Sequence, residues 1–206
     1  GSTDTFPVKG YSISSTLHSV PDCQKIIKKA VVESLKEDYH INWFDETGPV
    51  HQIQFSILKD QVTIMLDTTG TGLHKRGYRA NGNDAPLRET LAAAMVTLTR
   101  YRGREFLWDP FCGSGTIPIE AAMIAKNKAP GAFRRFSAEA FAWIDPKIWG
   151  QVRTEAKDRE FHGSYRIMGS DNDPKCVSLS MANARKAGLG DLIDFRDGDA
   201  TKMSLP

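Results

Sequence analysis

The stretch of sequence that decides the fold is Asp109-Pro110-Phe111-Cys112-Gly113-Ser114-Gly115-Thr116. It follows a short run, Glu105–Trp108, that ends in three apolar residues, and precedes an alanine-rich segment, Ile117–Ala125. This order predicts a buried strand, a glycine loop and a helix whose first N–H groups can meet a carboxylate. Two glycines alone are weak evidence of a site, because a tight turn from strand to helix needs the same residues.

The residues around the glycines narrow the class of ligand. The third glycine of the dinucleotide fingerprint would fall on Pro118, and no Lys-Ser or Lys-Thr pair follows the loop, which excludes a phosphate-binding P-loop. Asp109 stands at the expected strand end, where it can orient the loop or an ammonium group. We therefore expect a ligand with an adenosine group and no pyrophosphate, rather than NAD or ATP.

Two more polar turns follow predicted strands. Tyr165–Met168 leads into Gly169–Asp173, and Leu192–Phe195 leads into Asp197–Ala200. Strands that alternate with helices of about 10–15 residues predict a parallel sheet, whose ligand cleft lies at the carboxyl ends of the strands. The three turns are therefore expected at one edge of an α/β sheet.

Each of these turns has a functional and a purely structural interpretation. Asp171 could accept hydrogen bonds from two ribose hydroxyls, whereas Asp173 could merely cap the helix that begins at Pro174. In the third turn, at Asp199 and Ala200, a carboxylate could accept from an adenine amino group while a backbone N–H meets a ring nitrogen. A polar turn is the plain alternative there.

The first third of the chain has a different pattern. Asp22 can cap a helix that ends near Glu37, His51–Leu58 alternates apolar and polar residues, and a short turn leads to a second strand at Val62–Leu66. Turn residues at 67–72 interrupt this pattern. We place a domain boundary there, between an α+β portion at 1–70 and an α/β portion at 71–206.

Composition excludes several classes of protein. The 206 residues carry 27 Lys and Arg against 25 Asp and Glu, a net charge of +2 that does not by itself indicate nucleic-acid binding. Three separated cysteines form neither a disulfide framework nor a C-x-x-C site, and five histidines lack ligand spacing. No apolar run approaches about 18 residues. We expect a cytoplasmic protein that binds no metal and no membrane.

The glycine-loop block Asp109–Ala122, with Gly169–Asp173 and Gly198–Ala200, resembles class I S-adenosylmethionine-dependent methyltransferases. More narrowly, it resembles bacterial THUMP-domain RNA methyltransferases that act on guanine N2 of 23S ribosomal RNA. Three further segments are similar to that group, namely Leu73–Arg79, Ala85–Ala94 and Lys126–Gly131. The resemblance implies the first half of a Rossmann-like sheet, preceded by a THUMP portion that is incomplete at its start.

The resemblance also implies a cofactor, S-adenosylmethionine, and the residues that bind it. These are Asp109, Pro110, Phe111, Gly113, Ser114, Gly115, Asp171, Asn172, Asp199 and Ala200. The family's catalytic Asn-Pro-Pro-Tyr motif is expected after Pro206, and no Asn-Pro-Pro occurs upstream. Such a motif is needed because a weakly nucleophilic amine must be oriented and its protons accepted. We therefore assign no catalytic residue within this chain.

Two basic segments are candidates for RNA contact. The first combines cations with an aromatic side chain at Lys75, Arg76, Tyr78 and Arg79, and the second contains Arg134 and Arg135. Charges of a solvated linker are the alternative for the first segment. The aromatic side chains near the second are more readily explained as packing.

Two other side chains have open interpretations. Glu120 could bond back to the glycine loop or lie on a helix surface, and Cys112 lacks a neighbouring base, which favours a packed residue over a nucleophile.

The hypothesis for the function is methyl transfer to guanine N2 of 23S ribosomal RNA, with RNA as partner. The alternatives are a transfer-RNA guanine-N2 methyltransferase, a binding module without catalysis and, less favoured, an adenine-N6 DNA methyltransferase. The sequence does not indicate an oligomeric state.

Overall fold

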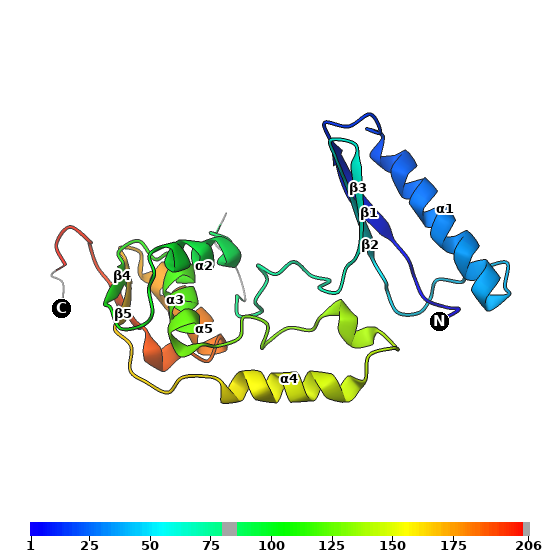
Figure 1. Cartoon of the computed structure of the whole chain (residues 1–206). Helices are drawn as coiled ribbons and strands as arrows, with labels where there is room; N and C mark the ends of the chain where they lie inside the picture. The colour runs from blue at the N-terminus through cyan, green and yellow to red at the C-terminus, as the bar shows by residue number, and fades with distance from the viewer. Residues whose placement is uncertain (80–85, 204–206) are drawn as a thin grey trace. The chain divides into compact units, whose positions relative to one another are not determined.

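The computed structural model describes residues 1–79 and 86–203. The chain divides into two compact units, Gly1–Thr71 with Arg135–Ile148, and Gly72–Arg134 with Trp149–Pro206 (Figure 1). Each unit has its own hydrophobic core. The domain boundary placed at residue 70 stays a prediction. The sequence also predicts a helix capped by Asp84, a residue that lies outside the described ones.

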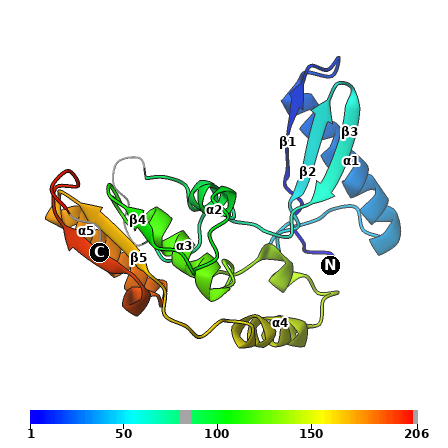
Figure 2. The ribbon, with the colours of Figure 1, turned by 60° about the vertical axis from the view of Figure 1, so that its left-hand side comes forward.

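The first unit is a three-stranded sheet with one long helix. Strand β1 (Val8–Ile13) runs parallel to β2 (Ile53–Leu58), and β2 pairs antiparallel with β3 (Gln61–Leu66). Helix α1 (Val20–Tyr39) lies along one face of the sheet (Figure 2). The alternating segment at 51–58 therefore forms the expected strand, and the α+β architecture is confirmed.

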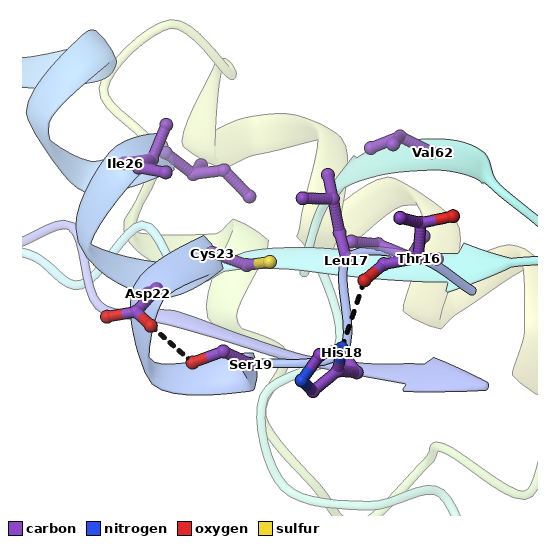
Figure 3. A pocket seen from close by; sticks show the side chains of 10 residues that line it. Thr16, Leu17, His18, Ser19, Asp22, Cys23, Ile26 and Val62 are labelled. Atoms are coloured by element: carbon purple, nitrogen blue, oxygen red, sulfur yellow. Dashed lines mark hydrogen bonds between the residues drawn. The ribbon is translucent and has the colours of Figure 1, made fainter. Parts of the chain in front are cut away.

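Helix α1 covers only part of the sheet. Its Cys23 packs with Phe55 and Ile57 of β2, but every residue of β3 is exposed. An apolar pocket of about 310 Å³ remains beside the start of the helix, where Ile26 and Val62 are among its lining residues (Figure 3). Ile26, on the same helix, is 67% exposed.

The start of α1 also differs from the expectation. The helix begins at Val20 with Ser19 as its N-cap, and Asp22 lies inside the first turn. The Ser19 hydroxyl donates a hydrogen bond to the Asp22 carboxylate (Figure 3). A carboxylate in the first turn is favourable because it faces the positive end of the helix dipole.

The segment 135–148 belongs to the first unit, although it follows the glycine loop in sequence. A short 3₁₀ helix, η1 (Ser137–Ala140), is joined to the chain after β3 by backbone bonds to the carbonyls of Thr68 and Thr69. The buried ring of Phe141 lies 4.7 Å from the ring of His51, measured between centroids. This contact supports the packing interpretation for Phe141, one of the aromatic side chains near Arg134 and Arg135.

The second unit contains a parallel sheet in the order β4-β5-β6. Its strands are β4 (Leu107–Asp109), β5 (Ile167–Asp171) and β6 (Asp194–Asp197), each within two residues of a predicted start. Helices α3 (Thr116–Lys126) and α5 (Pro174–Lys186) complete the expected α/β pattern, with η2 (Gly190–Leu192) before β6 and α2 (Glu89–Leu98) before β4. Helix α4 (Pro146–Asp158) begins in the first unit and continues in the second. Strand β1 and helix α4 were not expected from the sequence.

The core of the second unit is built around α3. Eight of its residues are buried, and most of them are small or aliphatic, such as Ile119 and Ala122. Small side chains let a helix approach its neighbours closely, and α3 contacts α2, β4 and β5. Within residues 1–79 and 86–203, no helix is both long and apolar enough to cross a membrane.

Candidate cofactor site

The three polar turns come together at one edge of the parallel sheet. Strand register pairs Asp109 with Gly169 and Asp171 with Asp197, so the carboxyl ends of β4, β5 and β6 are adjacent. The amide of Gly198, in the third turn, donates to the carbonyl of Asp171 at 3.0 Å. The three turns therefore lie side by side at the carboxyl edge of the sheet, as the order of strands predicts.

Asp171 ties this edge together. Its Oδ2 accepts the Gly113 amide at 2.9 Å, and its Oδ1 accepts the Asp173 amide at 3.0 Å. One residue earlier, the Ser170 carbonyl accepts the Cys112 amide at 2.8 Å. Strand β5 thus fixes the glycine loop through both a side chain and its backbone. Asn172 is exposed beside this arrangement.

The two loop glycines do different things. Both have positive φ, 54° at Gly113 and 79° at Gly115, where side chains are disfavoured. A Cβ on Gly115 would lie 2.7 Å from Cβ of Ser180, so this glycine permits close packing of the loop on α5. A Cβ on Gly113 would meet nothing within 4 Å. Gly113 therefore faces open space, in which a ligand can approach the backbone.

The acidic residue at the end of β4 also shapes the loop. The Asp109 carboxylate accepts the Phe111 amide at 3.1 Å. Burial raises the pKa of Asp109, and the nearby Asp171 carboxylate adds to the rise, while the Phe111 amide opposes it. Pro110 is half-buried and the Phe111 ring is 79% exposed. The loop therefore presents an aromatic side chain to the outside of the turn.

Cys112 is a packed residue. Its side chain is buried, and burial raises the pKa of the thiol to about 12, with Asp109 and Asp171 contributing. A thiol with this pKa carries almost no thiolate at neutral pH, so it is a poor nucleophile. This supports the packing interpretation made from the sequence.

In the third turn, the Asp199 carboxylate is bonded to neighbouring residues of the same turn. Oδ1 of Asp199 accepts from the Thr201 amide at 3.0 Å and from its hydroxyl at 2.7 Å, and Lys202 lies 3.1 Å from Oδ2. The hydrogen bonds from Thr201, then that from Lys202, lower the pKa of Asp199. Asp199 is exposed and Ala200 is half-buried. The third turn therefore lies at the expected edge of the sheet, and its carboxylate is already bonded to Thr201 and Lys202.

Two residues expected to contact RNA are buried instead. Tyr78 is 1% exposed and Arg76 is 8% exposed, so neither can stack on a base or meet a phosphate from this position. The Tyr78 hydroxyl donates to Oε1 of Glu120 at 3.1 Å, and Nη2 of Arg76 lies 3.3 Å from Oε2. The RNA role of these two residues stays a prediction, and the structure shows both of them bonded to a buried carboxylate.

Glu120 corresponds to neither interpretation made from the sequence. It lies on α3, is 1% exposed, and bonds to the segment before the glycine loop rather than to the loop itself. Burial raises the pKa of Glu120, against the lowering effect of Arg76 and Tyr78. Because its partners are 42 and 44 residues away, only the apolar surroundings of Glu120 on α3 could have signalled them.

The other candidate RNA residues vary in exposure. Arg79 is half-buried, and Nη2 donates to Oγ1 of Thr116 at 2.7 Å. Arg134 is half-buried and donates to the Gly72 carbonyl at 3.0 Å. Lys75 and Arg135 are exposed but belong to different compact units. Of the six residues, Lys75 and Arg135 are therefore the exposed ones, whereas Arg76 and Tyr78 are buried.

One supporting residue of the loop was missed. Nδ2 of Asn183, on α5, donates to the Ser114 carbonyl at 3.0 Å, and both residues are buried. A buried asparagine amid the apolar face of a helix is a detectable signal, because buried amides are normally hydrogen-bonded.

Among the residues that the structure describes, no group of three His, Cys, Asp or Glu could hold a metal.

Comparison with known proteins agrees with this geometry. Residues 76–206 match the family model described as RMKL-like, methyltransferase domain, and residues 1–67 match the THUMP domain. A Bacillus subtilis protein named as a candidate RNA methyltransferase, YpsC, is 50% identical over 194 residues, which is 93% of this chain. The ribosomal RNA large subunit methyltransferase K/L of Vibrio campbellii is 41% identical over 163 residues, 77% of this chain.

Solved structures give the same picture. A Listeria monocytogenes protein described as a predicted N6-adenine-specific DNA methylase has a TM-score of 0.94 at 46% identity, covering 99% of this chain and 54% of that one. SMU.472, described as a candidate methyltransferase and solved with SAH, has a TM-score of 0.90 at 39% identity, covering 98% and 54%.

The length of these relatives limits what they say about the present chain. The chain spans 50% of the Bacillus protein and 23% of the Vibrio protein. The matched part nevertheless includes the glycine loop, the Asp171 turn and the third turn. The chain therefore belongs to the RMKL-like methyltransferase family and carries a THUMP domain at its start.

Proposed function

We propose that this chain binds S-adenosylmethionine at the glycine loop and belongs to an enzyme that methylates guanine N2 of 23S ribosomal RNA. The observation that carries the proposal is Gly113, a positive-φ residue with open space above it, bonded to the carboxylate of Asp171. Such a glycine lets a ligand approach the loop backbone, beside a carboxylate that can accept hydrogen bonds from ribose hydroxyls. The SAH complex of SMU.472 supports the choice of cofactor.

The donor and acceptor groups of the site match such a ligand. Each carboxylate oxygen of Asp171 accepts one backbone amide and keeps further acceptor capacity for a ribose hydroxyl. The start of α3 supplies N–H groups suited to a carboxylate. Asp199 and Ala200, in the third turn, would face the adenine, and the exposed Phe111 would cover the loop.

The chemistry supplied by the bound cofactor is a methyl group activated by its sulfonium. The amine of the base must be oriented toward that methyl and must lose a proton. The Asn-Pro-Pro motif associated with that step does not occur in residues 1–206. We therefore expect this chain by itself to bind the cofactor without transferring methyl groups.

RNA is the proposed substrate class because of the first unit. The THUMP match at residues 1–67 and the names of the Bacillus and Vibrio relatives favour RNA. Adenine N6 of DNA is the second candidate, favoured by the description of the Listeria structure. A transfer-RNA guanine-N2 activity would use the same architecture and stays as the nearer alternative.

Cofactor binding is tested by calorimetry with S-adenosylhomocysteine and with NAD. We expect binding of the first alone, and a loss of about 1–3 kcal/mol in Asp171→Ala, the range for hydrogen bonds to a charged group. Asp191→Ala, at an exposed position in η2, is the control. An unchanged affinity in Asp171→Ala would remove this residue from the ribose role.

Substrate class is tested with the full-length protein and radiolabelled S-adenosylmethionine. Ribosomal RNA, transfer RNA and duplex DNA are offered separately, and the labelled nucleoside is identified. N2-methylguanosine in ribosomal RNA is the expected product. Labelled N6-methyladenine in DNA would replace the proposal with the second candidate.

A further inference from the structure

Residues 73–79 are tied to α3, the helix that follows the glycine loop, by polar contacts that are buried or half-buried. Arg79 donates from Nη2 to Oγ1 of Thr116, the first residue of α3, at 2.7 Å. The same guanidinium donates to the Leu87 carbonyl at 3.1 Å, and its Nη1 lies 3.7 Å from Oε1 of Glu89. Thr116 and Glu89 are both buried. The Arg79 side chain is therefore held in a defined position at the start of α3.

The position of Arg79 depends on its neighbours in the chain. Arg76 and Tyr78 are anchored on α3 by Glu120, and Nη1 of Arg76 also donates to the Leu73 carbonyl at 2.8 Å. Buried charges of this kind hold a defined geometry because separating them leaves a desolvated charge without a partner. The segment 73–79 is thus fixed to the same helix that it supports.

Thr116 transmits this order to the glycine loop. It directly follows Gly115, and its Oγ1 lies 3.3 Å from Oγ of Ser114, between the two glycines. Asn183 holds the Ser114 carbonyl from α5, and Asp171 holds the Gly113 amide from β5. The loop is therefore hydrogen-bonded to β5 and to α5, and Arg79 bonds to Thr116, where the loop leads into α3.

We propose that Arg79 is a positioning residue for the cofactor loop, acting through the hydroxyl of Thr116. The proposal rests on the proposed cofactor site and adds a role for the segment that sequence patterns assigned to RNA. Arg79 does not touch the cofactor in this scheme. It sets the geometry of residues 113–116, which determines how well the loop amides meet the ligand.

The test removes the acceptor and the donor separately in the 206-residue chain. Thr116→Val deletes the hydroxyl at nearly constant volume, and Arg79→Ala deletes the guanidinium. We expect each to weaken S-adenosylhomocysteine binding about tenfold, which is about 1.4 kcal/mol. The double variant should lose less than the sum of the two single losses, because both substitutions remove the contact between Arg79 and Thr116. Thr116→Ser and Arg79→Lys should recover part of the affinity.

Two controls separate positioning from general stability. Arg88→Ala removes an exposed arginine beside the same segment and should leave affinity unchanged. Val96→Ala opens a cavity in the core of α2 and should lower the free energy of unfolding while affinity stays constant. Unchanged affinity in Thr116→Val, or additive losses in the double variant, would overturn the proposal.

A second readout needs no ligand. The amide signals of Gly113 and Gly115 in NMR spectra should shift in Thr116→Val and Arg79→Ala but not in Arg88→Ala. If the parent chain fails to bind S-adenosylhomocysteine, the cofactor proposal fails, and these glycine signals still decide whether Arg79 orders the loop. Signals that stay in place in Thr116→Val would refute the positioning role.

Discussion

Replacing each loop glycine by alanine should separate packing from ligand access. Gly113 and Gly115 both have positive φ, and a Cβ there costs about 1–2 kcal/mol of folding stability. At Gly115 the new Cβ would also lie 2.7 Å from Cβ of Ser180 and 3.2 Å from Cζ of Phe195. Forcing such a contact in a packed region adds about 1–3 kcal/mol. We expect Gly115→Ala to lose about 2–5 kcal/mol and Gly113→Ala about 1–2 kcal/mol.

Urea unfolding followed by circular dichroism measures the difference between the two variants, since the backbone contribution is common to both. Calorimetry with S-adenosylhomocysteine should rank them in the opposite order, because the Cβ of Gly113→Ala occupies space that the ligand needs. Equal losses of stability would show that the contact between Gly115 and α5 is not as tight as described. Normal affinity in Gly113→Ala would move the ligand away from that glycine.

Three further predictions concern buried or titrating groups. Glu120→Ala should lower the free energy of unfolding by about 3–5 kcal/mol, since Arg76 would stay buried without its partner; a loss below 1 kcal/mol in urea unfolding would contradict the described ion pair. Burial acts to raise the pKa of Glu160, but hydrogen bonds from two lysine ammonium groups outweigh it and lower the pKa. Its stabilisation is therefore present above the ordinary carboxyl pKa of about 4.3 and is lost as pH falls, so Glu160→Gln should flatten the acid limb of a stability profile. A thiol reagent should modify the partly exposed Cys176 in the native chain and reach Cys112 only on unfolding, as mass spectrometry would show.

Local patterns predicted those elements whose signal lies in consecutive residues. Alternation at 51–58 predicted β2, and the glycine loop between an apolar run and an alanine-rich segment predicted β4 and α3. Strand β1 escaped because Gly10 interrupts its pattern. That glycine is needed by tertiary packing, since a Cβ there would lie 2.5 Å from Cδ1 of Phe55.

The candidate site was predictable in part for the same reason. The turns at Asp109, Asp171 and Asp199 follow strands of one parallel sheet, and topology alone places them at one edge. The roles of Arg76 and Tyr78 were not predictable, because they depend on Glu120, a residue more than 40 positions away. A cluster of cations and an aromatic residue looks the same in sequence whether it faces RNA or a buried carboxylate.

The bonds of Asp171 to Gly113 and Asp173 have a consequence for association. Hydrogen bonds within the chain fix the shape of the loop without a ligand, and the bond from the Asn183 amide to the Ser114 carbonyl is one of them. A receptor whose contacts are pre-organised loses little conformational entropy when it captures a ligand, so more of the contact energy becomes affinity. A change at Asp171 therefore acts twice, because it removes an acceptor and loosens the frame that holds the neighbouring donors in place.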